Sequence, residues 1–405
     1  MKKIFLTVIA LLSMASASVF GMYGVDSDWI DFLTHGNQFR ARFEQLGFTL
    51  GNDTIKGTFG FDAPSSYLGR IIQTKNGQGA TTANDTPQRT ELFPNISAGI
   101  GYTSSLIGVG FGYTISIADQ WRGVDGKAHQ QAAHTPTLVL NALDNNLRIA
   151  IPIQVFHTTK LEQFAYGTTG DRSGDNASTT TNSITAVSLD AQFRYYTGLE
   201  ALPQIRLYIR YGMASAQQKT VTIDPTDGSN VDTTYKEKFD SFGFDFRLFF
   251  GSIVEEVALQ PLFRVQFDTA CDKYLGSTRI TAVDVARNTT SYNLLTFAEA
   301  PTYDSNPYNL MILGGLGLTA NSDVISVFLR PELGLKVNDS GRKDDKARIG
   351  LGWNVYAELY ITPIKNLEWY MEIDMGNSTA SDYTFGLTTS GINATTGITW
   401  YLPAL

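Results

Sequence analysis

Apolar and polar residues alternate with period two along much of this chain. In segment 348–361 the alternation is unbroken: one face carries Ile349, Leu351, Trp353, Val355, Ala357, Leu359 and Ile361. Successive side chains of a β-strand point to opposite faces, so the segment predicts a strand with one apolar and one polar face. Strands of soluble proteins usually stop at about 5 or 6 residues, whereas a strand that crosses a membrane needs roughly 9 to 11. The length of the alternation therefore indicates a transmembrane barrel.

The connections between the predicted strands alternate in length. Short links occur at 51–53, 104–105, 144–146, 197–203, 252–256, 321–322 and 362–366, and longer polar links at 62–94, 118–136, 158–183, 216–238, 269–308, 338–347 and 377–382. Short turns at one rim and long loops at the other are typical of outer-membrane barrels, in which the long loops lie outside the cell. The strands that these links separate are 38–50, 54–61, 95–103, 106–117, 137–143, 147–157, 184–196, 204–215, 239–251, 257–268, 309–320, 323–337, 348–361, 367–376 and 383–402.

The number of predicted strands, fifteen, is odd, whereas bacterial single-chain barrels have an even number. Three explanations remain open: Tyr23 to His35 adds a first strand, 383–402 is two strands divided near Ser390 and Gly391, or 137–143 is not a strand. We expect an all-β fold over residues 38–405, a transmembrane antiparallel up-and-down β-barrel of 14 to 16 strands.

Charged residues are confined to one face of these strands. In 239–251, Phe242, Phe244, Phe246, Leu248 and Phe250 share a face, and Asp245 and Arg247 lie on the other. An Arg or Lys that points into lipid costs about 2 to 4 kcal/mol at the bilayer midplane. We therefore expect the apolar face to meet lipid and the charged face to line the lumen, with these candidate residues: Asp190, Arg194, Arg206, Arg210, Asp245, Arg247, Arg264, Asp268, Arg330, Glu332, Glu358 and Glu372.

Two interpretations of these charges stay open. They either line an aqueous pore, where opposed charges screen solutes, or form ion-pair ladders that brace a closed interior. Glycines within the strands, at Gly108, Gly110 and Gly112 and again at Gly314, Gly315 and Gly317, make room for a lumen or for a plug inside it.

The first residues predict an export signal over 1–21. Lys2 and Lys3 precede the apolar run Ile4 to Leu12, and small residues follow at 15–17. Residues 22–37 then form an N-terminal segment that is either a plug or a first strand.

The composition excludes several classes of function. No later stretch approaches 18 consecutive apolar residues, which excludes a helical inner-membrane protein. A formal net charge of −8 argues against nucleic acid as a partner. Cys271 is the single cysteine, and the four histidines, His35, His129, His134 and His157, are scattered. We therefore predict no metal site, no cofactor and no catalytic residues.

Four stretches near the start of the chain carry a family resemblance: Phe20-Gly-Met-Tyr-Gly24, then 28–42, 45–52 and 54–61. They resemble the start of the variable surface proteins (Vsp) of intestinal spirochaetes. That family consists of abundant outer-membrane proteins of similar length, encoded as several paralogues and linked to antigenic variation. The resemblance supplies no catalytic residues. The ending Trp400-Tyr-Leu-Pro-Ala-Leu405 departs from the terminal aromatic residue that is usual in barrels.

Together these features predict a surface-exposed outer-membrane barrel with variable antigenic extracellular loops and no enzymatic activity. The alternative is a porin or solute-selective outer-membrane channel. A soluble secreted β-sandwich and an outer-membrane hydrolase are further hypotheses with less support in the sequence. The expected partners are the lipid bilayer and, through the loops, host antibodies or host surface molecules; oligomerisation is left open.

Overall fold

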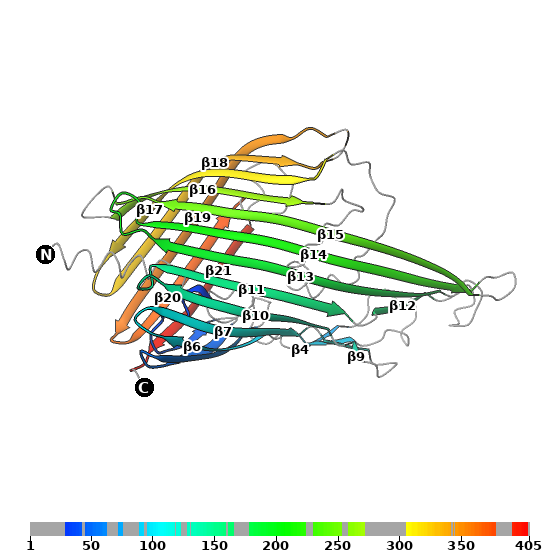
Figure 1. Cartoon of the computed structure of the whole chain (residues 1–405), viewed down its shortest axis with the longest axis horizontal. Coiled ribbons are helices and arrows are strands. Elements are labelled where there is room, and N and C mark those ends of the chain that lie inside the picture. Colours follow the sequence, from blue (N-terminus) through cyan, green and yellow to red (C-terminus); the bar gives the residue numbers. More distant parts are fainter. Residues whose placement is uncertain are drawn as a thin grey trace.

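A computed structural model shows a closed barrel of antiparallel strands (Figure 1). Sixteen strands follow one another around the wall, each paired with its neighbours along the chain, and the last, β21, pairs with the first, β1, to close it. The short strand β12 extends the wall beyond β11, where it pairs with the far part of β13. The structure describes residues 29–42, 45–62, 72–75, 89–92, 95–117, 119–122, 128–129, 131–158, 161–165, 178–223, 230–252, 258–271, 305–341, 343, 345–377 and 391–403.

The strands of the barrel wall are long, as the alternation predicts. Their bounds are β1 Gln38–Arg42, β2 Gln45–Gly51, β3 Ile55–Asp62, β6 Asn95–Thr103, β7 Ile107–Ile117, β10 Gln131–Ala142, β11 Leu147–Thr158, β12 Leu161–Ala165, β13 Ser178–Tyr196, β14 Gln204–Ile223, β15 Asn230–Phe249, β16 Ala258–Ala270, β17 Tyr308–Asn321, β18 Ile325–Asp339, β19 Arg348–Ile364, β20 Leu367–Gly376 and β21 Gly391–Tyr401.

Short polar turns join the strands at one end of the barrel. The side chain of Asn52 accepts hydrogen bonds from the backbone N–H groups of Thr54 and Ile55, both at 2.9 Å. Asp144, Asn145 and Asn366 adopt positive φ angles, which Asn and Asp tolerate better than most residues. Local side-chain chemistry thus sets these turns, and β21 ends beside them.

The opposite end carries the longer connections. Strands β13, β14 and β15 contain 19, 20 and 20 residues and extend past the rest of the wall at this end (Figure 1). A separate four-stranded sheet is formed by β4 Ile72–Lys75, β5 Arg89–Leu92, β8 Asp119–Arg122 and β9 Ala128–His129. This sheet lies within the predicted loops 62–94 and 118–136. Parts of the predicted loops 158–183 and 216–238 are also strand, because the paired backbone of the wall continues there beyond the apolar stretch.

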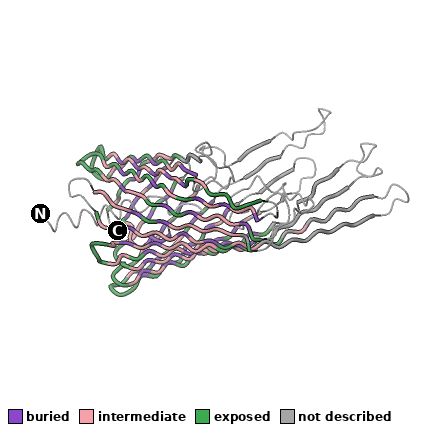
Figure 2. Tube along the Cα trace, turned by 90° about the horizontal axis from the view of Figure 1, so that it is seen from above, coloured by how far each residue is buried: buried purple, intermediate pink, exposed green. Residues whose placement is uncertain are grey.

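The outer surface of the wall is apolar. Buried and exposed residues alternate along the strands (Figure 2), and the exposed positions include Ile100, Phe111 and Leu351. On β15, Phe242 and the residue that follows the strand, Phe250, are the exposed ends of the apolar stripe. The eight residue-to-residue steps from Phe242 to Phe250 span ~20 Å along the barrel axis at a tilt near 40°. This height approaches the roughly 25 Å apolar band of outer-membrane barrels.

The sixteen strands of the wall confirm the predicted range of 14 to 16. The strand missing from the list of fifteen comes from a division that none of the three explanations named. Segment 38–50 is two strands, β1 and β2, rather than one. Trp29–Asp31 is a short 3-10 helix, η1, rather than a strand, and 137–143 is a genuine part of β10. In 383–402 the structure describes β21 alone; residues 383–390, like the predicted signal 1–21, lie outside the described residues.

No helix among the described residues is both long enough and apolar enough to cross a membrane.

Candidate functional site: the charged inner face

The charged residues proposed for the lumen lie on the face of the strands that alternates with the apolar surface. We call this the inner face. Seven of the twelve are buried: Arg194, Arg206, Asp245, Arg264, Glu332, Glu358 and Glu372. The other five, Asp190, Arg210, Arg247, Asp268 and Arg330, are partly buried.

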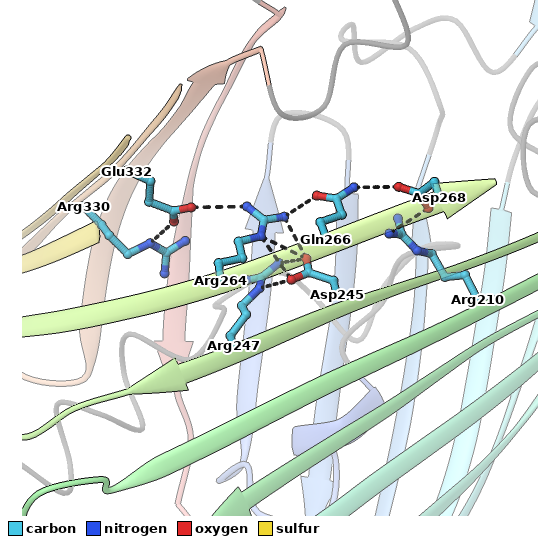
Figure 3. A network of polar contacts seen from close by, with 8 residues as sticks. All are labelled: Arg210, Asp245, Arg247, Arg264, Gln266, Asp268, Arg330 and Glu332. Atoms are coloured by element: carbon cyan, nitrogen blue, oxygen red, sulfur yellow. Dashed lines mark hydrogen bonds and ion pairs between the residues drawn. The ribbon is translucent and has the colours of Figure 1, made fainter. Parts of the chain in front are cut away.

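A network of ion pairs and hydrogen bonds joins β14 to β18 along this face (Figure 3). Asp245 accepts hydrogen bonds from Arg247 on its own strand and from Arg264 on β16, with N···O distances of 2.7 Å to each. Arg264 also reaches Glu332 on β18 at 3.4 Å, and Arg330 donates to the same carboxylate at 2.7 Å. A carboxylate shared between two guanidinium groups thus links neighbouring strands.

A second pair lies further along the same strands. Arg210 on β14 forms an ion pair with Asp268 on β16 at 3.0 Å, and both side chains are about a third exposed. Asp190 on β13 lies directly opposite Arg210 in the strand register.

Five arginines stand side by side in one cross-strand row, which we call the arginine row. The strand registers place Arg148 opposite Arg194, Arg194 opposite Arg206, Arg206 opposite Arg247, and Arg247 opposite Arg264. Like charges directly opposite each other destabilise a sheet. The row therefore needs negative charge close to it, and Asp245 supplies that charge at the Arg247–Arg264 end.

The N-terminal segment supplies the negative charge at the other end of the row. Asp31 of η1 bridges two strands: its carboxylate accepts from Arg148 at 2.6 Å and from Arg194 at 2.5 Å. All three side chains are nearly fully buried. The sequence offered no sign of this contact, because Asp31 and Arg194 are 163 positions apart.

Apolar side chains of the same segment pack on glycines of the wall. A Cβ atom added to Gly99 or Gly112 would lie 2.6 Å from the ring of Trp29, and one added to Gly110 would lie 3.3 Å from Phe32. Trp29, Phe32 and their neighbours Ile30 and Leu33 are buried as one cluster. The glycines of β6 and β7 thus provide the space in which residues 29–33 lie against the wall.

The segment is also held by a lysine of the wall. Lys56 on β3 donates hydrogen bonds to the backbone oxygens of Leu33 at 2.9 Å and His35 at 2.6 Å. Residues 29–35 are therefore fixed to three parts of the barrel, through apolar packing, ion pairs and backbone hydrogen bonds.

The surroundings of this segment shift two pKa values downward. Burial alone would raise the pKa of Asp31, but the guanidinium groups of Arg194 and Arg148 outweigh it and lower the pKa to about 2. Desolvation lowers the pKa of His35 to about 4, and the attraction of Asp31 offsets this only in part. At neutral pH Asp31 is therefore ionised and His35 is neutral.

Carboxylates gather on the wall formed by β19 and β20. Glu358 and Glu372 are buried and lie directly opposite each other in the strand register. The hydroxyl of Tyr356 donates to Glu358, and the guanidinium of Arg42 on β1 lies 4.7 Å from the ring centre of Tyr370. The inner face is therefore basic over β11 to β16 and acidic over β19 and β20.

The other candidate groups do not come together. His134 bonds the hydroxyl of Tyr113 at 2.6 Å and His157 bonds Thr185 at 3.0 Å, so they lie in separate contacts. Cys271 is exposed at the end of β16. Within the described ranges, no three His, Cys, Asp or Glu side chains form a group that could hold a metal ion.

Sequence reasoning missed Asp31 and Arg148. Arg148 stands in the strand predicted at 147–157 and on the face opposite Ile149 and Ile151, so alternation alone would have assigned it to the charged face. Asp31 had no such signal, because it lies outside every strand.

Comparison with known proteins gives one family match. A family model described as Serpulina hyodysenteriae variable surface protein matches residues 2–401. A search of curated proteins finds no match.

Among solved structures, the copper transporter OprC is similar at 12% identity and a TM-score of 0.43, covering 91% of this chain. The chain spans 58% of the length of OprC. The toluene transporter TodX of Pseudomonas putida is similar at 9% identity and a TM-score of 0.37, covering 94% of this chain and 95% of TodX. The CymD monoaromatic hydrocarbon channel is similar at 8% identity and a TM-score of 0.33, covering 87% of this chain and 89% of CymD.

Proposed function

Because the chain belongs to the Serpulina hyodysenteriae variable surface protein family and forms an outer-membrane β-barrel, we propose that it displays its long connections on the outside of the cell as a variable antigenic surface. The observation that carries this proposal is the asymmetry of the barrel. Tight turns lie at one end, and β13 to β15 extend beyond the wall at the other. Outer-membrane barrels place their short turns in the periplasm.

The native cysteine provides the test of orientation. Cys271 is exposed at the end of β16, where its N–H donates to the backbone oxygen of Asp240 on the extended strand β15. It therefore lies at the end with the long connections. A membrane-impermeant maleimide should label Cys271 in intact cells.

The matched control places the thiol at the other end of the barrel. In a Cys271→Ser background, Leu106→Cys puts it on the β6–β7 turn, at a position that is 83% exposed. This variant should be labelled only after the outer membrane is opened. Labelling of the turn but not of Cys271 in intact cells would reverse the proposed orientation.

The antigenic role concerns the long connections themselves. Loop composition supports it: residues 168–183 are rich in Thr, Asn, Asp, Gly and Ser, and surface loops commonly carry recognition. Serum raised against whole cells should bind peptides that span 168–183 more strongly than peptides that span the turn at 197–203. Equal binding would argue against the long loops as the principal antigens. The proposal includes no enzymatic step.

A channel is the second candidate function, and the charged inner face favours it. We propose that the twelve charged residues of that face line the lumen, and that residues 29–35, within the segment 22–37, form a plug there. The packing of Trp29, Phe32 and Leu33 on the wall supports the plug.

Single-channel recording in a planar bilayer tests the channel. The wild-type barrel should conduct weakly. The variant Asp31→Asn/Trp29→Ala, which removes the ion pairs and the largest apolar contact of the segment, should conduct more. Equal conductance of the two proteins would contradict the plug, and an absence of conductance from both would leave only the surface role.

A further inference from the structure

The arginine row has an uneven supply of counter-charges. At one end Asp31 forms ion pairs with Arg148 and Arg194, and at the other end Asp245 forms ion pairs with Arg247 and Arg264. Arg206 stands in the middle of the row, between Arg194 and Arg247. Arg194 and Arg247 also have a guanidinium group on each side, but each of them forms an ion pair with an aspartate.

Among the described residues, no carboxylate lies within ion-pair distance of Arg206. Its Nε donates to Oε1 of Gln204 at 3.0 Å, and its guanidinium lies 4.6 Å from the ring centre of Phe249. The charge of Glu358 on β19 reaches it only at longer range. Arg206 is buried, with an exposed fraction of only 7%. A buried charge without an ionic partner is costly.

Gln204 adds a second donor without an acceptor. Its side-chain oxygen is used by Arg206, while its Nε2 finds no hydrogen-bond partner in the part of the chain that the structure describes. The residue is 5% exposed. Native proteins rarely leave a buried donor unsatisfied. A buried guanidinium without an ion-paired carboxylate and a buried amide donor without an acceptor are therefore joined by one hydrogen bond.

We propose that Arg206 and Gln204 form a binding site for a small oxyanion, a carboxylate or a phosphate, on the inner face near the short-turn end of the barrel. The planar guanidinium matches the paired oxygens of both anions. Asp31 and Asp245 already show this chemistry in the same row, because each carboxylate bridges two neighbouring arginines. The bound anion would play the same role for Arg206. This site goes beyond the surface role and does not depend on it.

Binding of two probes to the purified full-length barrel in detergent micelles tests the site. Inorganic phosphate and acetate are titrated by calorimetry in a buffer of low ionic strength, with an otherwise non-binding counter-ion. Wild type should bind phosphate saturably at one site, and added NaCl should weaken the binding because the attraction is ionic. Binding of acetate as well assigns a general oxyanion site, and binding of phosphate alone assigns a site for phosphoryl groups.

Two variants on one strand separate the site from general positive charge. Arg206→Met should weaken phosphate binding at least tenfold. Arg210→Met removes an arginine four positions along the same face, whose partner Asp268 lies 3.0 Å away, and should keep the wild-type affinity within twofold. Equal losses in the two variants, or no saturable binding of either anion to wild type, would overturn the proposal.

Gln204→Leu keeps the test decisive if Arg206→Met does not refold. It leaves Arg206 in place and removes the amide donor, so phosphate binding should weaken several-fold. An unchanged affinity would remove Gln204 from the site and contradict the proposal. Neither result bears on the labelling of Cys271, so failure of this site and failure of the surface role can be told apart.

Discussion

Neutralising Asp31 should destabilise the barrel strongly. The variant Asp31→Asn keeps the shape of the side chain and removes its charge, which leaves Arg148 and Arg194 buried without their carboxylate. Their exposed fractions are 5% and 1%. Removal of one partner from a buried ion pair typically costs about 3 to 5 kcal/mol. We expect a loss of that size in the free energy of unfolding at pH 7.

Reversible urea unfolding of the refolded protein, followed by tryptophan fluorescence, measures this loss. The control is Asp268→Asn, which breaks the ion pair with Arg210. Those side chains are 27% and 35% exposed, and exposed pairs contribute about 0 to 1 kcal/mol. If Asp31→Asn lost less than about 1 kcal/mol, or no more than Asp268→Asn, the reasoning from burial would be refuted.

The pH profile gives an independent check on the same residue. The pKa of Asp31 is lowered to about 2 in the fold, against roughly 3.9 in an unfolded chain. The stabilisation is therefore complete above the unfolded pKa and is lost as the pH falls through the folded one. The stability gap between wild type and Asp31→Asn should shrink by about 2 to 3 kcal/mol between about pH 5 and pH 1. A stability difference that stays constant over this pH range would show that the fold does not lower the pKa of Asp31.

Three further predictions concern other parts of the barrel. Gly112→Ala should cost about 1 to 3 kcal/mol, because its methyl group would displace the ring of Trp29; urea unfolding measures it, and an unchanged midpoint would contradict the close packing. Leu329→Arg on the outer face of β18 should lower the free energy of unfolding in lipid vesicles by about 2 to 4 kcal/mol, whereas Leu106→Arg in a turn should lower it by at most about 1 kcal/mol. Equal losses would show that the outer face of β18 does not contact lipid. The pKa of His35 falls to about 4 in the fold, so wild type should lose stability as the pH drops from about 6.5 to 4, and His35→Gln should lose less over that range.

The strands could be predicted from the sequence because the alternation of apolar and polar residues shows which face of each strand meets lipid. The one wrong division shows the limit. In 38–50 the apolar positions are odd at Phe39 and Ala41 and even at Leu46, Phe48 and Leu50. This change of phase marks the boundary between β1 and β2, although the two residues between them, Phe43 and Glu44, include no glycine or proline that would signal a turn. Attention to phase, and not only to period, would have given the even count.

The contacts of the inner face were less accessible to sequence reasoning. Alternation assigns Arg194 and Arg206 to one face, but only the register of β13 and β14 places them opposite each other. A shift of one residue in register would separate them, and a single sequence does not fix that register. The contacts of Asp31 were harder still to predict, because its partners lie in strands more than a hundred positions later in the chain.

The seam between β1 and β21 has a consequence for biogenesis. Gln38 pairs with Tyr401, so the hydrogen bonds that complete the cylinder join the first strand to the last one synthesised. Every partial chain that emerges during export carries two unpaired strand edges, which readily pair with other chains. Transit to the membrane should therefore depend on chaperones that shield these edges, and a chain truncated before residue 391 should aggregate or be degraded rather than insert.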